Sequence, residues 1–341
     1  MNVSLKYLWA KRVVLFPILS LLILLTLSGC SLLPSGAAEI SSTEYPNEQL
    51  LIAAERLEDR LDDPDLRIID MRPEESYQDG HIPGAVHVPV SEITASVDGV
   101  PFEVDLEQIA ETLSKIGLTA EMTAVIYDNL GMMSSARLFW TLEYLGHQDV
   151  RILHGGWNQW QAAGLPTDSQ TRSISPSQYP VDPDPARLVT AEQVLNALGD
   201  PEVVILDARS PQEYTGEVAY ADRGGHIPGA LNLAWRDALT GGDTVYTTDS
   251  AWREELRDQD VEYFKQPQEL ESLLSGLGLK EGDRIITYCQ THWRGAHLYF
   301  LLRLMGYENV QGYDGSWAEW GNDPELPVAT GAQPGDYSPG S

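Results

Sequence analysis

The chain has 341 residues, of which 43% are hydrophobic, and it carries a formal net charge of −29. This length accommodates two domains of ordinary size, each able to bury a core. A negative charge of this size would repel phosphate backbones, so we expect no nucleic-acid partner.

The first thirty residues form a segment of different composition. Basic residues at positions 6, 11 and 12 precede an apolar run over residues 13–27, and Leu27-Ser28-Gly29-Cys30 follows. This pattern is typical of a secretory signal, and the run is short for a membrane span of about 20 residues. Leu-Ser-Gly-Cys resembles a bacterial lipobox, which implies cleavage before Cys30 and acylation of its thiol. We expect a membrane-anchored lipoprotein outside the cytoplasm, in the periplasm or on the cell surface, with an uncleaved anchor as the alternative.

The rest of the chain repeats itself. Residues 66–72 are echoed by 203–209, Gly-His-Ile-Pro-Gly-Ala recurs at 80–85 and 225–230, and Gly-x-Trp recurs at 155–157 and 315–317. Two homologous domains in tandem explain this spacing, which is too long for a solenoid repeat. We expect a signal peptide (1–30), a tether (31–45), a first domain (46–166), an extended linker (167–185), a second domain (186–328) and a flexible tail (329–341).

Each half alternates short apolar runs with segments of helical period. The runs at residues 124–127 and 284–288 are apolar on both faces, and the segments at 106–116 and 136–145 have the periodicity of helices. Runs of this kind indicate buried parallel strands covered by helices. The sequence therefore predicts an α/β fold, with a mostly parallel sheet and helices on both of its faces in each domain.

Cys289 is the most informative residue of the chain. It follows the predicted strand at 284–288 and precedes a polar loop that Arg294 closes before a helical stretch. Helix N-termini and neighbouring arginines favour the thiolate form of a cysteine. If Cys30 is acylated, Cys289 has no intrachain disulfide partner, since the chain has two cysteines. We expect a reactive thiol, with a buried and inert cysteine as the alternative.

The first domain has Asp128 where the second has Cys289. A carboxylate cannot hold a sulfur atom, so we expect the first domain to be non-catalytic. A carboxylate can also act as a nucleophile, but no basic or metal-binding cluster near Asp128 in the sequence supports that alternative.

Four motifs together resemble the rhodanese family of sulfurtransferases. They are Asp-x-Arg after the first strand, Gly-His-Ile-Pro-Gly-Ala, a strand ending at Cys-x4-Arg, and a late Gly-x-Trp, and they span residues 46 to 328. The resemblance implies an enzyme that carries sulfur as a persulfide on Cys289. It also implies a small anionic donor such as thiosulfate, and a thiol, cyanide or protein acceptor. Related phosphatases and arsenate reductases have a wider Cys-x5-Arg loop, so the loop length favours sulfur.

The resemblance and the loop sequence also suggest which side chains bind the donor. Arg294 would bond to donor oxygens, and Arg209, at the family's Asp-x-Arg position, would be a second clamp unless it only orders its own loop through a salt bridge. Arg223, before the second Gly-His-Ile-Pro-Gly motif, is a further candidate contact.

The remaining loop residues are Gln290, Thr291, His292 and Trp293, which we also expect at the donor site. His292 either adds positive charge or shuttles a proton, or it satisfies backbone groups. Trp293 either walls the cleft or packs into the core, and a loop tip favours the wall.

The loop leaves the donor open, because it matches neither the Cys-Arg-Lys-Gly loop of typical thiosulfate enzymes nor the Cys-Gly-Ser-Gly loop of typical mercaptopyruvate enzymes. The alternatives are therefore a 3-mercaptopyruvate sulfurtransferase and a non-catalytic module that binds sulfur or a partner. We expect no cofactor and no metal, because His292 and His297 are not spaced to share a helix face and no second cysteine completes a zinc set.

Overall fold

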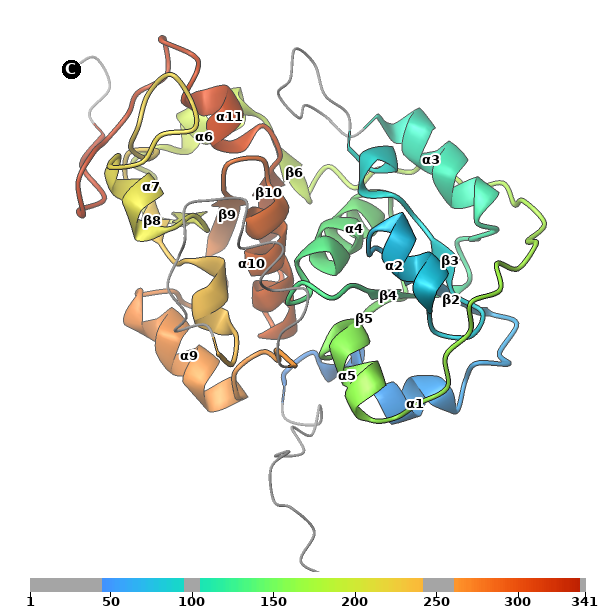
Figure 1. Ribbon diagram of the computed structural model, residues 1–341. Helices are drawn as coiled ribbons and strands as arrows, with labels where there is room; N and C mark the ends of the chain where they lie inside the picture. Colours follow the sequence, from blue (N-terminus) through green and yellow to red (C-terminus); the bar gives the residue numbers. More distant parts are fainter. Residues whose placement is uncertain (1–44, 95–104, 242–260, 338–341) are drawn as a thin grey trace, which may run out of the picture. The chain divides into compact units, whose positions relative to one another are not determined.

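The computed structural model describes residues 45–94, 105–241 and 261–337 (Figure 1). The predicted signal peptide, Cys30 and nearly all of the tether lie outside these residues. Within the described ranges, no helix is both long enough and apolar enough to cross a membrane.

The first domain is built around a five-stranded sheet with the strand order β1-β5-β4-β2-β3. Its elements, in chain order, are η2 (Glu48–Leu50), β1 (Leu51–Ile52), α1 (Ala54–Glu58), β2 (Leu66–Asp70), α2 (Glu74–Asp79), β3 (Val86–His87), η3 (Val90–Glu92), α3 (Leu106–Lys115), β4 (Thr123–Tyr127), α4 (Met133–Tyr144), β5 (Val150–Leu153) and α5 (Gly156–Ala162).

The second domain repeats this arrangement with the strand order β6-β10-β9-β7-β8. Its elements are β6 (Leu188–Val189), α6 (Ala191–Ala197), β7 (Val203–Asp207), α7 (Pro211–Thr215), β8 (Leu231–Asn232), η4 (Trp235–Ala238), α9 (Pro267–Gly276), β9 (Arg284–Tyr288), α10 (Trp293–Leu304), β10 (Val310–Tyr313) and α11 (Ser316–Trp320). All strand pairs in both sheets are parallel. The predicted α/β fold and its internal repeat are confirmed.

Local sequence explains where the helices begin and end. Asp105 caps α3 by accepting hydrogen bonds from the amides of Glu107 and Gln108, and the chain leaves the helix through Gly117, whose φ of +68° favours glycine. In the second domain, Ser210 and Glu213 form a capping box at the start of α7, where Pro211 is the first helical residue. These signals place the helices between strands that are apolar on both faces.

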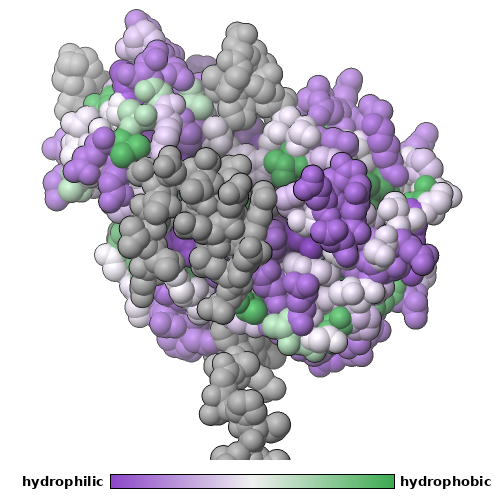
Figure 2. Space-filling model, viewed as in Figure 1, coloured by the Kyte–Doolittle hydropathy of each residue, from purple (hydrophilic) through white to green (hydrophobic). Residues whose placement is uncertain are grey.

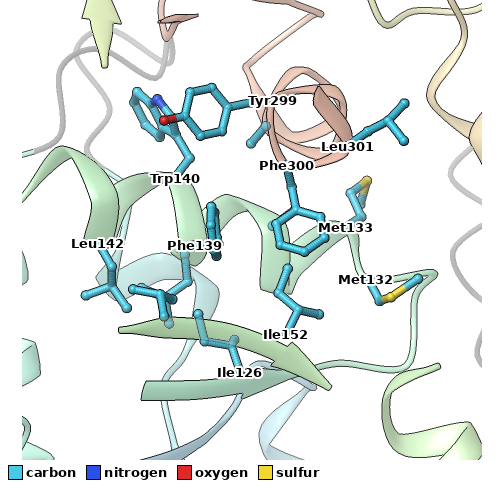
Figure 3. Close-up of a cluster of buried hydrophobic side chains, with 14 of the residues drawn as sticks. Ile126, Met132, Met133, Phe139, Trp140, Leu142, Ile152, Tyr299, Phe300 and Leu301 are labelled. Atoms are coloured by element: carbon cyan, nitrogen blue, oxygen red, sulfur yellow. The ribbon is translucent and has the colours of Figure 1, made fainter. Parts of the chain in front are cut away.

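The core lies on both faces of each sheet. One cluster on each outer face belongs to a single domain and is built around buried tryptophans, Trp160 in the first domain and Trp317 and Trp320 in the second. The third and largest cluster is shared, because α4 and α10 pack against each other with the rings of Phe139 and Phe300 edge to face, their centroids 4.7 Å apart (Figure 3).

The segments that join and follow the domains are held in place by hydrogen bonds. The predicted linker at 167–185 contains no helix, and it lies along the first domain, where Tyr179 is buried and its hydroxyl is 2.8 Å from His147 Nδ1. The predicted flexible tail does not begin at residue 329. Ala329 pairs with His226, and the carbonyl of Pro334 accepts from the amide of Gly229, so the chain stays bound to the second domain through these residues.

Hydrophilic residues predominate on the face seen in Figure 2, and hydrophobic residues occur there as isolated spots. Among the described residues, the large hydrophobic side chains that are exposed are Val90, Val181 and Tyr220. Single exposed apolar residues are ordinary on protein surfaces, so they mark no interaction site by themselves.

Candidate active site

Cys289 lies immediately after β9, at the carboxyl end of the central strand of the second sheet. Its side chain is buried, with the residue 1% exposed. Its amide donates to Ser316 Oγ (3.2 Å), and its carbonyl accepts from the amide of Trp317 (2.9 Å). The first residues of α11 therefore fix the backbone of Cys289 from both sides.

The loop after Cys289 turns sharply into α10. His292 has a φ of +58°, in the left-handed region, and is the residue before the first helical residue, Trp293. The carbonyl of Gln290 accepts from the amide of Ala318 (2.9 Å), which ties this loop to α11 as well. A short loop that ends at a helix N-terminus brings several amide groups close to the residue that precedes it.

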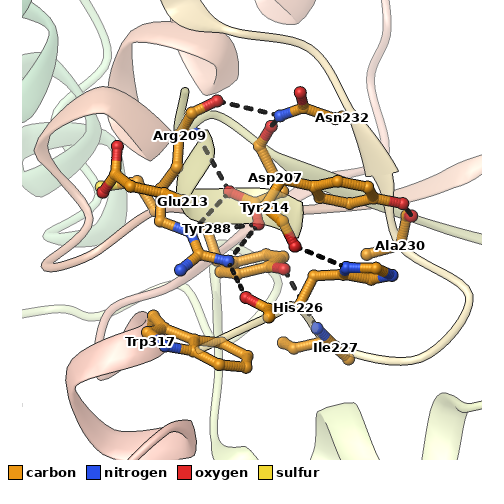
Figure 4. A network of polar contacts seen from close by, with 12 residues as sticks. Asp207, Arg209, Glu213, Tyr214, His226, Ile227, Ala230, Asn232, Tyr288 and Trp317 are labelled. Carbon is orange, nitrogen blue, oxygen red and sulfur yellow. Dashed lines mark hydrogen bonds and ion pairs between the residues drawn. The ribbon is translucent and has the colours of Figure 1, made fainter. Parts of the chain in front are cut away.

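Arg209 does not face the loop as a free cation (Figure 4). Its Nε and Nη2 donate to the carboxylate of Asp207, and Nη2 also donates to the carbonyl of Gly225 (2.7 Å). Its guanidinium carbon is 4.5 Å from the centre of the Trp317 ring. This arrangement supports the alternative in which Arg209 orders its own loop, and the donor-clamp role receives no support.

The same arrangement recurs in the domain without a nucleophile. Arg72 bonds to Asp70 and to the carbonyl of Gly80, and its guanidinium carbon lies 3.9 Å from the centre of the Trp157 ring. Because an Asp–Arg–Trp stack exists in both domains, the stack is part of the fold of each.

Arg294 is held by Glu213. Its Nη1 donates to Glu213 Oε2 (2.6 Å) and its Nη2 to Oε1 (2.9 Å), a bidentate pair. Burial alone would raise the pKa of Glu213, but the hydrogen bond and charge of Arg294 outweigh it and lower that pKa below its ordinary value. The prediction that Arg294 clamps the donor is therefore not supported, because Glu213 already neutralises the guanidinium.

His292 points away from the loop surface. It is fully buried, its ring lies edge-on against Trp140 with centroids 4.7 Å apart, and neither ring nitrogen has a hydrogen-bond partner among the described residues. Burial, and then the charge of Arg137, lower the pKa of His292 well below its ordinary value. The low pKa disfavours the predicted positive charge, and the unpartnered ring nitrogens give no support to a role in satisfying backbone groups.

The other predicted site residues fall into two groups. Gln290, Thr291 and Trp293 are partly exposed and follow Cys289 in the chain, and Trp293 packs against the shared core. Arg223 is not at the loop. Its guanidinium donates hydrogen bonds to the carbonyls of Trp320, Gly321 and Leu326, and it thereby closes the end of α11. The prediction that Arg223 contacts the sulfur donor is not supported.

Asp128 occupies the corresponding place in the first domain. Its carboxylate accepts from the amides of Leu130 (2.7 Å), Met132 (3.1 Å) and Ser135 (2.7 Å), and from Ser135 Oγ (2.9 Å). Burial raises the pKa of Asp128 despite these bonds. Residues 128–132 separate β4 from α4, whereas residues 289–292 separate β9 from α10, so the loop of the first domain is one residue longer. The carboxylate of Asp128 lies inside this longer loop.

Comparison with known proteins decides the family. A model of the rhodanese-like domain matches residues 53–163 and 190–323. The chain belongs to the rhodanese-like family. The predicted resemblance and the tandem arrangement of the two domains are thereby confirmed.

Several relatives are similar to the chain over nearly their whole length. The thiosulfate sulfurtransferase of Azotobacter vinelandii is 32% identical over 287 residues, covering 84% of this chain and 98% of that protein. A probable 3-mercaptopyruvate sulfurtransferase of Pseudomonas aeruginosa is 34% identical over 296 residues, covering 82% and 98%. The crystal structure of SseA from Escherichia coli, a 3-mercaptopyruvate sulfotransferase, covers 79% of this chain and 98% of its own, with a TM-score of 0.66 and 26% identity.

Two contributors to the rhodanese-like site were missed by sequence reasoning. Glu213 stands three residues after Ser210, and this capping-box spacing would have placed it beside the Asp-x-Arg motif. Ser316 occupies the middle of the repeated Gly-x-Trp motif, where the first domain has Gly156. A residue-by-residue comparison of the two repeats would have marked it as different.

We expect the carboxylate of Asp128, in the first rhodanese-like domain, to take no part in sulfur transfer. We expect Asp128→Ala to lower the free energy of unfolding by about 1–3 kcal/mol, because buried amides lose their acceptor. Sulfur-transfer turnover per folded molecule should stay within about twofold of wild type, because Asp128 lies in the other domain's loop. Urea unfolding and steady-state assays check the two parts, and a large loss of turnover in a folded variant would show that Asp128 takes part in the chemistry.

Proposed function

We propose that this chain is a sulfurtransferase that carries sulfane sulfur on Cys289. The observation that carries the proposal is the setting of this thiol, which ends the central strand of the second rhodanese-like domain and begins the loop into α10. Relatives that bear the name thiosulfate sulfurtransferase match the chain over nearly their entire length.

In the first step, the Cys289 thiolate attacks the outer sulfur of thiosulfate. The sulfur–sulfur bond of the donor breaks, its electron pair leaves on sulfite, and a new bond joins Sγ to the transferred sulfur. In the second step, a nucleophile such as cyanide or a thiolate attacks that outer sulfur and regenerates the Cys289 thiolate. No external oxidant or reductant is consumed in this scheme.

Backbone amides of the loop, and not a free cation, would stabilise the negative charge during transfer. Arg294 is neutralised by Glu213, and His292 is buried and uncharged. In the first domain, two amides of the equivalent loop and one from the first turn of α4 already donate to a carboxylate. We infer that the shorter loop of the second domain directs its amides in the same way at the sulfur on Cys289.

Thiosulfate is the proposed donor, and 3-mercaptopyruvate is the alternative that the names of other relatives favour. With thiosulfate and cyanide, initial rates should give parallel double-reciprocal lines, since the persulfide separates two half-reactions. We expect kcat/KM to be at least about tenfold higher for thiosulfate than for 3-mercaptopyruvate. The reverse order would favour the alternative donor, and no turnover with either would favour a module that binds sulfur or a partner.

We further propose that the mature protein is anchored to a membrane through a lipid on Cys30 and works in the periplasm or at the cell surface. The support is the leader sequence alone, with its basic start, apolar run and Leu-Ser-Gly-Cys. Cys30→Ser should abolish lipid attachment. The variant should then either leave the membrane fraction after its leader is cleaved at another site, or keep its leader uncleaved. Processed and lipid-labelled Cys30→Ser protein would contradict the proposal.

A further inference from the structure

A buried ion pair joins the first domain to the turn that supports Cys289. Arg137, on α4, donates through Nη1 to Asp314 Oδ1 at 2.5 Å. The two side chains are 1% and 5% exposed. A charge pair at this depth is costly to desolvate, and it holds its two elements in one relative position as long as both partners remain.

Asp314 begins the turn that fixes the catalytic cysteine. It is followed by Gly315 and Ser316, and Ser316 Oγ accepts from the amide of Cys289 (3.2 Å) while donating to the carbonyl of Tyr313 (2.8 Å). The next two amides, of Trp317 and Ala318, bond to the carbonyls of Cys289 and Gln290. A shift of Asp314 would therefore move the groups that hold Cys289.

Arg137 also reaches the loop on its other side. Its guanidinium carbon lies 5.7 Å from the centre of the Trp293 ring and 4.8 Å from that of Trp140, the ring against which His292 packs. One side chain of the first domain thus adjoins both the turn before α11 and the start of α10.

The internal repeat supplies a natural comparison. His297 is the fifth residue of α10, as Arg137 is of α4, and His154 precedes the first Gly-x-Trp motif as Asp314 precedes the second. Burial lowers the pKa of His154 to about 4 and that of His297 to about 3, so both are neutral near pH 7. The equivalents of the charged pair are therefore two neutral residues, His297 for Arg137 and His154 for Asp314. The charged pair is the one whose acidic member begins the turn that supports Cys289.

We propose that Arg137 is a positioning residue for Cys289, supplied by the domain that has no nucleophile. By holding Asp314 it keeps the Asp314–Ser316 turn against the Cys289 backbone, and the loop amides stay aligned on the sulfur. The proposal rests on the function proposed above, and it gives the non-catalytic domain a part in the reaction.

The test compares two reactions of Cys289 in the full chain carrying Cys30→Ser. Persulfide formation from thiosulfate in a single turnover needs an aligned loop, whereas alkylation by iodoacetamide needs only access to the buried sulfur. Arg137→Met should slow persulfide formation at saturating thiosulfate by about tenfold or more, with the half-saturating concentration changed by less than about twofold. Alkylation should become faster by about fivefold, because the loop is less tightly held.

The isosteric Asp314→Asn is the second variant, used also if Arg137→Met does not fold. It should slow persulfide formation in the same way, and the double variant should be no slower than the slower single one, because the pair acts as a unit. His154→Phe, at the equivalent position of the first domain, is the matched control and should leave both rates within about twofold.

Two outcomes would overturn the proposal. One is that folded Arg137→Met or Asp314→Asn keeps both rates near wild type, and the other is that His154→Phe changes them as much. If wild type takes up no sulfur from thiosulfate, the proposed function fails, but the alkylation rates of the variants still decide whether Arg137 positions Cys289.

Discussion

Replacing Cys289 by serine is expected to lower kcat for sulfur transfer from thiosulfate to cyanide by about 10³-fold or more. A serine hydroxyl has nearly the same size but cannot form a persulfide, so the covalent route is lost. The fold should persist, because the bonds that hold residue 289 are made by its backbone amide and carbonyl.

Initial rates at saturating donor, together with circular dichroism, measure these two effects. Cys30→Ser is the matched control, since it removes the other cysteine of the chain and should leave kcat within about twofold. Turnover by Cys289→Ser at a tenth of the wild-type rate or more would contradict the proposed mechanism.

The second large effect expected is a loss of stability in mild acid. Among the described residues, four buried histidines have lowered pKa values, and the shift is large in three of them. Burial brings the pKa of His154 to about 4 and that of His297 to about 3, and burial with the charge of Arg137 places that of His292 well below its ordinary value. In the unfolded chain all three bind a proton near pH 6.5. Their protonation therefore favours unfolding, so stability is complete above pH 6.5 and is lost as the pH falls below it.

His154 and His297 should each cost about 1.4 kcal/mol per pH unit below pH 6.5, down to their lowered pKa values. Between pH 7 and pH 5 this amounts to about 2 kcal/mol per residue and about 4 kcal/mol for the two, a large fraction of the stability of a domain. His292 contributes in the same direction. Urea unfolding at the two pH values measures the loss.

His154→Phe isolates one of the three contributions. The ring of His154 lies between those of Tyr45 and Tyr263, and its Nε2 is buried without a hydrogen-bond partner among the described residues. Phenylalanine keeps an aromatic ring there and cannot titrate, so the loss between pH 7 and pH 5 should shrink by about 2 kcal/mol. Equal stability of the wild-type protein at both pH values would contradict the burial of neutral histidines.

The strands, helices and repeat are predictable because they depend on local pattern. The run at 284–288 forms β9, and the helical period at 106–116 forms α3, since an apolar run and an amphipathic stripe each have one way to be buried in a parallel α/β sheet. The repeat alone then puts Asp128 and Cys289 at equivalent strand ends, where both lie in the fold.

The partners of the charged side chains are not predictable in this way. The motifs suggest a donor for both Arg294 and Arg209, but Glu213 and Asp207 bind them, because a buried guanidinium takes the nearest carboxylate that the fold provides. Arg137 and Asp314 are 177 residues apart and belong to different domains, so no spacing in the sequence connects them. The inward position of His292 is equally hidden, because the left-handed backbone that turns its ring inward leaves no mark in the sequence.

The central claim is that Cys289 carries the transferred sulfur. The most direct test is the intact mass of the chain with Cys30→Ser, measured before thiosulfate, after it, and again after cyanide, with Cys289→Ser alongside. The account predicts a gain of one sulfur atom that cyanide removes and that the Cys289→Ser variant never shows. A gain that persists in that variant, or no gain with either thiosulfate or 3-mercaptopyruvate, would contradict it.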